Sequence, residues 1–203
     1  MSNQERQQGY LRQAWLVIVL AFAYGGALAG VHTALAPRIE QNKRQETYDV
    51  IPDLVPGADK ERTKELLIEA TDGKLRRVYK TYDGDGNHNG WVLSAAGTGF
   101  ADRIEVLVGV DAQLSALTGL YVLDQKETPG LGDYITQLDF RDRFRGKPLT
   151  PPLEAVQSDP SSSHEILAVT GATISSWSVC TIVNKAIAQL REPILSQNSS
   201  SGS

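Results

Sequence analysis

The chain has 203 residues, a mild net charge of −4 and one cysteine, Cys180. This length predicts one domain with an appendage, and a single cysteine excludes an internal disulfide or a metal cluster held by several thiolates of this chain. The sequence has no basic stripe interleaved with aromatic residues, which argues against nucleic-acid binding. His32, His88 and His164 lie far apart, which argues against a histidine metal site.

An uncharged apolar segment lies between Arg12 and Arg38. As a helix, residues 14–36 extend about 35 Å, enough to cross a hydrocarbon core of about 30 Å. We therefore expect a retained single-pass membrane helix, and the alternative is a signal peptide cleaved after Ala27-Leu-Ala29. Gly26 and Gly30 would allow another helix to approach closely, although small residues are common in membrane helices generally. Basic residues flank both ends of the segment, so the positive-inside rule does not decide its orientation.

The rest of the chain predicts an α+β domain. A polar, helix-compatible stalk from Arg38 to Val50 is followed by a loop and a short helix within Glu61–Ala70. Short apolar runs separated by turn residues then favour an antiparallel sheet. These predicted strands are Leu75–Tyr82, Gly90–Ala95, Arg103–Val110 and Leu117–Leu123.

Four further elements are predicted after the sheet. Asp139–Gly146 has the pattern of a short amphipathic helix, Pro148–Ser163 that of a surface loop, and Ile166–Val169 that of a short strand. Apolar residues spaced by three and four predict a helix over Ser175–Arg191 that is capped by Ser175 or Ser176 and ends before Pro193. The predicted organisation is a cytoplasmic N-terminus (1–13), a transmembrane helix (14–36), a stalk and linker (37–60), a ligand-binding domain (61–195) and a disordered tail (196–203).

Two segments have compositions suited to a ligand. In Thr170-Gly-Ala-Thr173, a glycine turn joins a predicted strand to a predicted helix, and a helix start offers backbone N–H groups to a phosphate. In residues 127–132, Glu-Thr-Pro-Gly-Leu-Gly, the glycines and proline form a rigid loop that a flat ligand can approach closely. Each segment taken alone is better explained as an ordinary turn.

Taken together, the two segments resemble the FMN-binding domain of the G subunit of Rnf electron-transport complexes, which is related to the C subunit of the sodium-pumping NADH:quinone oxidoreductase. The shared features are residues 127–132, Thr170-Gly-Ala-Thr-Ile-Ser-Ser176, the Gly97–Phe100 turn, and the strands at Ile104–Val110 and Leu117–Leu123. The resemblance also includes the N-terminal membrane helix and covers nearly the whole chain.

The resemblance implies a covalently bound FMN. In this family a flavin transferase joins the FMN phosphate to the last threonine of the [S/T]-G-A-[S/T] motif, which is Thr173 here. The sequence departs from many members at Leu167, where they carry Asp. The other implied FMN-binding residues are Thr170, Gly171, Ala172, Ser175 and Ser176 around the phosphate, and Glu127, Thr128, Pro129, Gly130, Leu131 and Gly132 against the flavin ring.

The resemblance further implies an electron-transfer subunit of an ion-translocating ferredoxin:NAD oxidoreductase. Such a subunit would be anchored in the cytoplasmic (inner) membrane, with its FMN domain on the periplasmic or extracellular side. The expected partners are the other membrane subunits of the complex and the flavin transferase, and a cytochrome or iron–sulfur protein is a further candidate. The alternatives are a membrane-anchored flavoprotein carrier or sensor outside such a complex, and an exported binding domain without redox function.

Two remaining features receive structural interpretations. Asp85-Gly-Asn-His-Asn-Gly90 resembles the first half of a calcium-binding loop, but the position of its bidentate glutamate is Ala96. A polar hairpin tip explains this segment without a metal. Cys180 lies among the core positions of the last predicted helix, and we interpret it as a buried, unreactive thiol.

Overall fold

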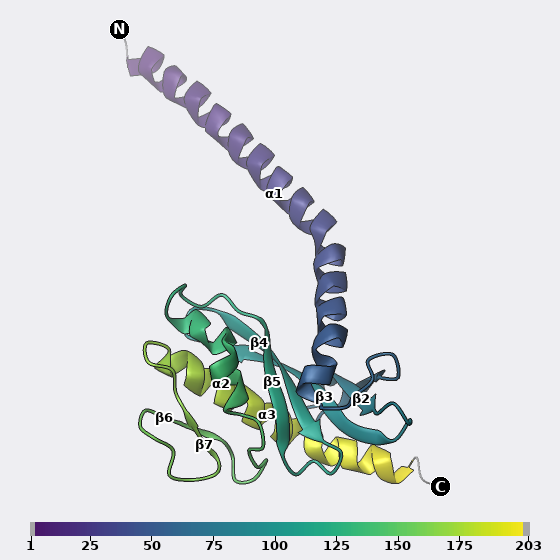
Figure 1. Cartoon of the computed structure of the whole chain (residues 1–203). Helices are drawn as coiled ribbons and strands as arrows, with labels where there is room; N and C mark the ends of the chain where they lie inside the picture. Colours follow the sequence, from purple (N-terminus) through teal and green to yellow (C-terminus); the bar gives the residue numbers. More distant parts are fainter. Residues whose placement is uncertain (1–2, 201–203) are drawn as a thin grey trace. The chain divides into compact units, whose positions relative to one another are not determined.

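The computed structural model describes residues 3–200, with side-chain environments from residue 14 to residue 197. It divides into two compact units, Met1–Gln45 and Glu46–Ser203. The elements in chain order are α1 (Asn3–Leu54), β1 (Lys64–Glu69), β2 (Leu75–Tyr82), β3 (His88–Thr98), β4 (Arg103–Asp111), β5 (Leu117–Asp124), the 3-10 helix η1 (Gly132–Thr136), α2 (Leu138–Asp142), β6 (Glu154–Val156), β7 (Glu165–Leu167) and α3 (Thr173–Ser200) (Figure 1).

The first unit consists of the helix α1, which continues without a break into the second unit (Figure 1). From residue 14 onward the helix is long and apolar enough to cross a membrane. Its large side chains, among them Trp15, Phe22 and Leu28, are exposed. The predicted stalk is part of the same helix, because no residue between Pro37 and Leu54 interrupts it.

The second unit is built on a five-stranded antiparallel sheet in the order β1-β2-β3-β4-β5 (Figure 1). This confirms the predicted α+β fold with an antiparallel sheet. Alternate residues of β4 face opposite sides, as the two-residue period of a strand requires. Val106 and Val108 join the larger core, which includes α3, whereas Leu107 joins a smaller core with the end of α1.

The end of α1 packs against two glycines on the last two strands of the sheet, β4 and β5. Gly109 of β4 and Gly119 of β5 are directly paired, and a Cβ on either would lie 3.0 Å or less from backbone atoms of Leu54. The Leu54 carbonyl also accepts a hydrogen bond of 2.6 Å from the Thr118 hydroxyl. Because Gly109 and Gly119 have no side chains, they leave a notch in the sheet that holds Leu54, the last residue of α1.

The helix predicted within Glu61–Ala70 is wrong, because Lys64–Glu69 forms the edge strand β1. Its backbone pairs with β2, and Ile68 is buried in the larger core with Leu66 packed against it. A six-residue segment with three central apolar residues and charged ends fits either a helix or a strand, and here the neighbouring strand decides the outcome.

The predicted loop Pro148–Ser163 contains the short strand β6, which pairs in parallel with β7. Residues 154–156 have no alternating pattern, so their pairing depends on the partner strand alone. The short helix around Phe140 is confirmed as α2. Phe140 and Phe144 are both fully buried, with ring centroids 5.3 Å apart.

The prediction that the last helix ends before Pro193 is wrong, because α3 extends to Ser200 with Pro193 inside it. A proline has no N–H for the carbonyl four residues earlier, here that of Gln189. The backbone N–H of Thr71 donates to that carbonyl instead, at 3.1 Å. Ile194 is fully buried beyond the proline. Residues 196–200 of the predicted disordered tail are therefore helical, and residues 201–203 lie outside the described part of the chain.

Candidate functional site

Three segments that are distant in sequence line one pocket of about 260 Å³. They are the turn after β3, the loop between β5 and η1, and the junction that leads from β7 into α3. Both motifs singled out in the sequence therefore lie at the same place. The pocket is lined by Phe100, Thr128, Leu131, Gly132, Gly171, Ala172, Thr173, Ile174 and Ser175.

The Thr-Gly-Ala-Thr segment is a tight turn that begins α3. Gly171 has φ of +83°, a conformation that favours glycine. The Ala172 N–H donates to the Val169 carbonyl at 2.9 Å, and the Ser176 N–H makes the first helical bond, to the Ala172 carbonyl at 2.8 Å. The N–H groups of residues 173–175 thus precede the first helical hydrogen bond, at the positive end of the helix dipole. Thr173, the first helical residue, lines the pocket.

Ser175 and Ser176 lie inside the first turn of α3 rather than at its cap, because the helix starts at Thr173. Both are buried. The Ser176 hydroxyl donates to the Ala172 carbonyl at 2.9 Å and accepts from the Val169 N–H at 3.1 Å. It therefore fastens the incoming chain to the helix start.

The second motif packs against this turn. Leu131 and Asp133 donate their N–H groups to the Thr128 carbonyl, which closes the loop before η1. A Cβ on Gly171 would lie 3.2 Å from Cδ2 of Leu131, so a side chain at position 171 would require Leu131 to shift. Gly130 and Gly171 have positive φ values, which favour glycine, whereas a Cβ on Gly132 would lie within 3 Å of Glu127 and Ser175.

Glu127 lies beneath the pocket, with 5% of its surface exposed. Its Oε1 accepts from the Phe100 N–H at 2.9 Å and the Ala101 N–H at 3.2 Å. Its Oε2 accepts from the Ser175 hydroxyl at 2.6 Å. The carboxylate therefore contacts the other two segments of the pocket from the loop that carries it.

The structure brings together seven of the predicted site residues and separates the others. Glu127 and Ser176 are buried behind the pocket, and Thr170, Pro129 and Gly130 are exposed without lining it. Phe100 and Ile174 line the pocket with 63% and 50% of their surfaces exposed, yet neither was predicted as a site residue. The Gly97–Phe100 turn of the resemblance was the available clue to Phe100, and the clue to Ile174 was its position inside the Thr170–Ser176 motif.

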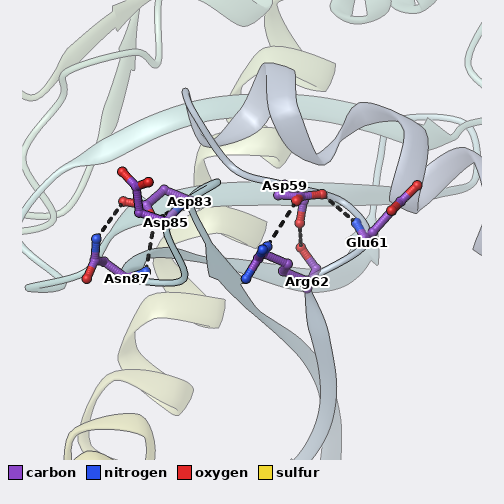
Figure 2. Close-up of polar contacts among 7 residues, drawn as sticks. Asp59, Glu61, Arg62, Asp83, Asp85 and Asn87 are labelled. Carbon is purple, nitrogen blue, oxygen red and sulfur yellow. Dashed lines mark hydrogen bonds and ion pairs between the residues drawn. The ribbon is translucent and has the colours of Figure 1, made fainter.

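The calcium-like segment forms a hairpin tip between β2 and β3 (Figure 2). The Asp83 carboxylate accepts hydrogen bonds from the backbone N–H groups of Asp85, at 3.0 Å, and Asn87, at 2.8 Å. The same view shows Asp59 bound to the Glu61 N–H and paired with Arg62. Because the Asp83 carboxylate is bound to backbone N–H groups of its own turn, the conformation of the tip is explained by its internal hydrogen bonds. Asp59 is likewise engaged within its own turn.

Cys180 is buried within α3, and this burial raises the pKa of its thiol to about 12. A thiol that remains protonated at neutral pH is a poor nucleophile. The interpretation of Cys180 as an unreactive core residue is therefore supported.

The residues of the pocket fit an FMN. The exposed apolar surfaces of Phe100, Leu131 and Ile174 suit a flat aromatic ring, since a ring that covers them removes apolar surface from water. The hydroxyl of Thr173 and the N–H groups at the start of α3 suit a phosphate. The pocket thus has an apolar part and a polar part, which match the flavin ring and the phosphate of the cofactor.

Comparisons with known proteins agree with this pocket. A family model described as an FMN-binding domain matches residues 99–188, a range that contains all three pocket segments. The solved structure of NqrC from Shewanella oneidensis has the same fold, with a TM-score of 0.56, 23% identity and a match that covers 63% of each chain.

Relatives over most of the chain are G subunits of ion-translocating complexes. The G subunit of the Na⁺-translocating ferredoxin:NAD⁺ oxidoreductase complex of Acetobacterium woodii is 30% identical over 85% of this chain and 87% of its own. The G subunit of the ion-translocating oxidoreductase complex of Methanosarcina acetivorans is 26% identical over 84% and 89%. The chain therefore belongs to the family of G subunits of ion-translocating oxidoreductase (Rnf) complexes, and is an FMN-binding electron-transfer subunit of that class.

Proposed function

We propose that this subunit carries its FMN as a phosphoester of Thr173 and transfers single electrons within a membrane-bound ferredoxin:NAD oxidoreductase complex. The observation that carries the proposal is that Thr173 lines the same pocket as Thr128, Leu131 and Gly132 of the second motif. When bound, FMN accepts and donates electrons. The side chains of this subunit hold the cofactor and exclude water from it.

The attachment requires only a hydroxyl that an external transferase can reach. Thr173 is partly exposed and is the first residue of α3. Formation of the ester would join the side-chain oxygen of Thr173 to the FMN phosphorus and break the phosphorus–oxygen bond to the other half of a flavin dinucleotide donor, and the hydroxyl proton would leave with that half. The chain would therefore gain the mass of FMN less one water. The N–H groups at the start of α3 would stabilise the negative charge of the phosphate.

The apolar walls bind and orient the ring. Phe100 and Ile174 offer large exposed apolar surfaces to the pocket, and Leu131 of the motif loop adds a third. Burying such surfaces contributes roughly 25 cal/mol for each Å² removed from water. A tether at one end and apolar contact at the other fix the ring without acid–base groups at the pocket.

The helix α1 places the subunit in the membrane, with residues 14–36 in the hydrocarbon core and the FMN domain on the periplasmic or extracellular side. Its length and apolar character support the first part of this proposal. A covalent tether supports the second, because a dissociable cofactor would be lost by dilution outside the cell. The partners are the membrane subunits of the complex, and the flavin transferase acts during maturation.

Intact mass spectrometry of the full chain, co-expressed with a flavin transferase, tests the attachment. The wild-type chain is expected to gain one FMN less one water and to fluoresce after denaturing electrophoresis. Thr173→Ala is expected to lose both properties, and Thr173→Ser to keep them. Thr181→Ala is the matched control, because Thr181 is an exposed threonine of the same helix outside the pocket. Full flavin content in Thr173→Ala would refute the attachment.

A single introduced cysteine tests the orientation. Cys180 is buried, so Ser158→Cys adds one exposed thiol to the FMN domain. A maleimide that cannot cross membranes is expected to label this thiol in intact cells. Labelling that appears only after the cells are lysed would place the domain on the cytoplasmic side. Co-purification of the tagged chain with the other members of the complex tests the assembly.

A further inference from the structure

The resemblance to the family placed Glu127 against the flavin ring, but the structure places it behind the pocket. We propose that Glu127 is the positioning residue that assembles the site, holding the Phe100 wall and the Thr173 helix start to the motif loop. The proposal rests on the proposed function, because the pocket it assembles is the one that takes FMN. Three hydrogen bonds and the local packing carry it.

The carboxylate joins segments that are otherwise separate in the chain. Phe100 and Ala101 lie 27 and 26 residues before Glu127, and Ser175 lies 48 residues after it. Each segment contributes a wall of the pocket, and each donates to this one side chain. Ser175 is two residues beyond Thr173 in the first turn of α3, so its hydrogen bond fixes the helix start on which Thr173 is presented.

The chemistry of the three donors calls for a carboxylate. Two backbone N–H groups and one hydroxyl all donate to it, and an ionised carboxylate is the side chain that accepts at both oxygens and donates at neither. Hydrogen bonds to a charged acceptor are shorter and stronger than neutral ones. An aspartate in this position would be one methylene too short to reach the same donors.

The surrounding glycines show how closely the chain is packed around Glu127. A Cβ on Gly99 would lie 2.1 Å from its Oε1, and a Cβ on Gly132 would lie 2.8 Å from its Cβ and its Oε2. Both segments reach the carboxylate only because these positions have no side chain. The two glycines and the glutamate therefore act as one unit beneath the pocket.

Hydrogen–deuterium exchange of the full chain in detergent, expressed without the flavin transferase, tests the contact directly. In Glu127→Ala, the amides of residues 100 and 101 are expected to exchange about 10- to 100-fold faster than in the wild type, because each loses its buried hydrogen-bond acceptor. Glu127→Gln is expected to restore most of their protection, since its amide oxygen still accepts. Ser175→Ala is expected to speed exchange at residues 176–178, the first hydrogen-bonded amides of α3, while leaving residues 100 and 101 protected.

Glu165→Ala is the matched control. Glu165 also accepts from a backbone N–H and a hydroxyl, both of Ser161, but it lies outside the pocket. It is expected to leave exchange at residues 99–104 and flavin content unchanged. With the transferase present, Glu127→Ala is expected to reduce the fraction of chains that carry FMN and to lower the fluorescence anisotropy of the flavin, and Glu127→Gln to recover both.

Wild-type exchange at residues 100 and 101 in Glu127→Ala, or wild-type flavin content and anisotropy in that variant, would overturn the proposal. If Glu127→Ala does not fold, Ser175→Ala decides, because unchanged exchange at residues 176–178 would show that the helix start does not depend on the carboxylate. A wild-type chain without covalent FMN would refute the proposed function, but the exchange measurements would still establish whether Glu127 holds the three segments.

Discussion

Gly132→Ala adds one methyl group at the most crowded point beneath the pocket. Its Cβ would lie 2.8 Å from Cβ of Glu127 and 2.9 Å from Oγ of Ser175. Such contacts require the neighbouring atoms to move, and overpacking of this kind costs about 1–3 kcal/mol. Because φ of Gly132 is not in the left-handed region, alanine fits its backbone and the whole cost comes from these contacts.

Urea unfolding of the flavin-free full chain in detergent, followed through the fluorescence of buried Trp91, measures this cost. We expect Gly132→Ala to lower the free energy of unfolding by about 2 kcal/mol. In the chain co-expressed with a flavin transferase, we expect the same substitution to lower the covalent FMN content. Gly84→Ala is the control, because a Cβ at Gly84 meets nothing within 4 Å. A free energy of unfolding within about 0.5 kcal/mol of the wild type, with full FMN content, would refute the packing argument.

Three further predictions concern the rest of the domain. Gly109→Ala is expected to lower the free energy of unfolding by about 3 kcal/mol, because its Cβ would meet the Leu54 carbonyl oxygen in the notch that holds the end of α1. Burial, and then the charge of Lys80, lower the pKa of His88 below 6.5. The unfolded chain therefore binds this proton more readily, so stability is expected to fall as the pH drops below about 6.5, and less so in His88→Gln. Cys180 is expected to react with a thiol reagent only after unfolding, because burial raises its pKa to about 12.

A specific experimental result would contradict each of these predictions. Equal unfolding midpoints for Gly109→Ala and the Gly84→Ala control would show that the notch is not tightly packed. Parallel pH profiles between pH 5 and 8 for the wild type and His88→Gln would remove His88 as the source of the pH dependence. Stoichiometric labelling of Cys180 in the native chain would show that α3 opens readily.

The local sequence pattern was sufficient to predict the strands whose side chains face a core at alternate positions. The runs at β2, β4 and β5 alternate or are nearly all apolar, and their predicted bounds agree with the structure to within one residue. The pattern failed at β1, because a six-residue run serves a helix or a strand equally well until a neighbouring strand supplies hydrogen-bond partners. It failed again at Pro193, where a partner for the carbonyl of Gln189 comes from Thr71, over 100 residues away.

The two motifs, the glycine in each, and the threonine proposed to carry the flavin were all visible in the order of residues along the chain. Their meeting in one pocket was implied only by the resemblance to a family, because it depends on how β3, β5 and α3 are arranged around the sheet. The same is true of Glu127. Its position in the motif indicated a ligand contact, but its burial and its three donors, which come from residues 26 to 48 positions away, make it a support of the site instead. A side chain's role depends on which groups surround it, and those groups are brought together only by the tertiary fold.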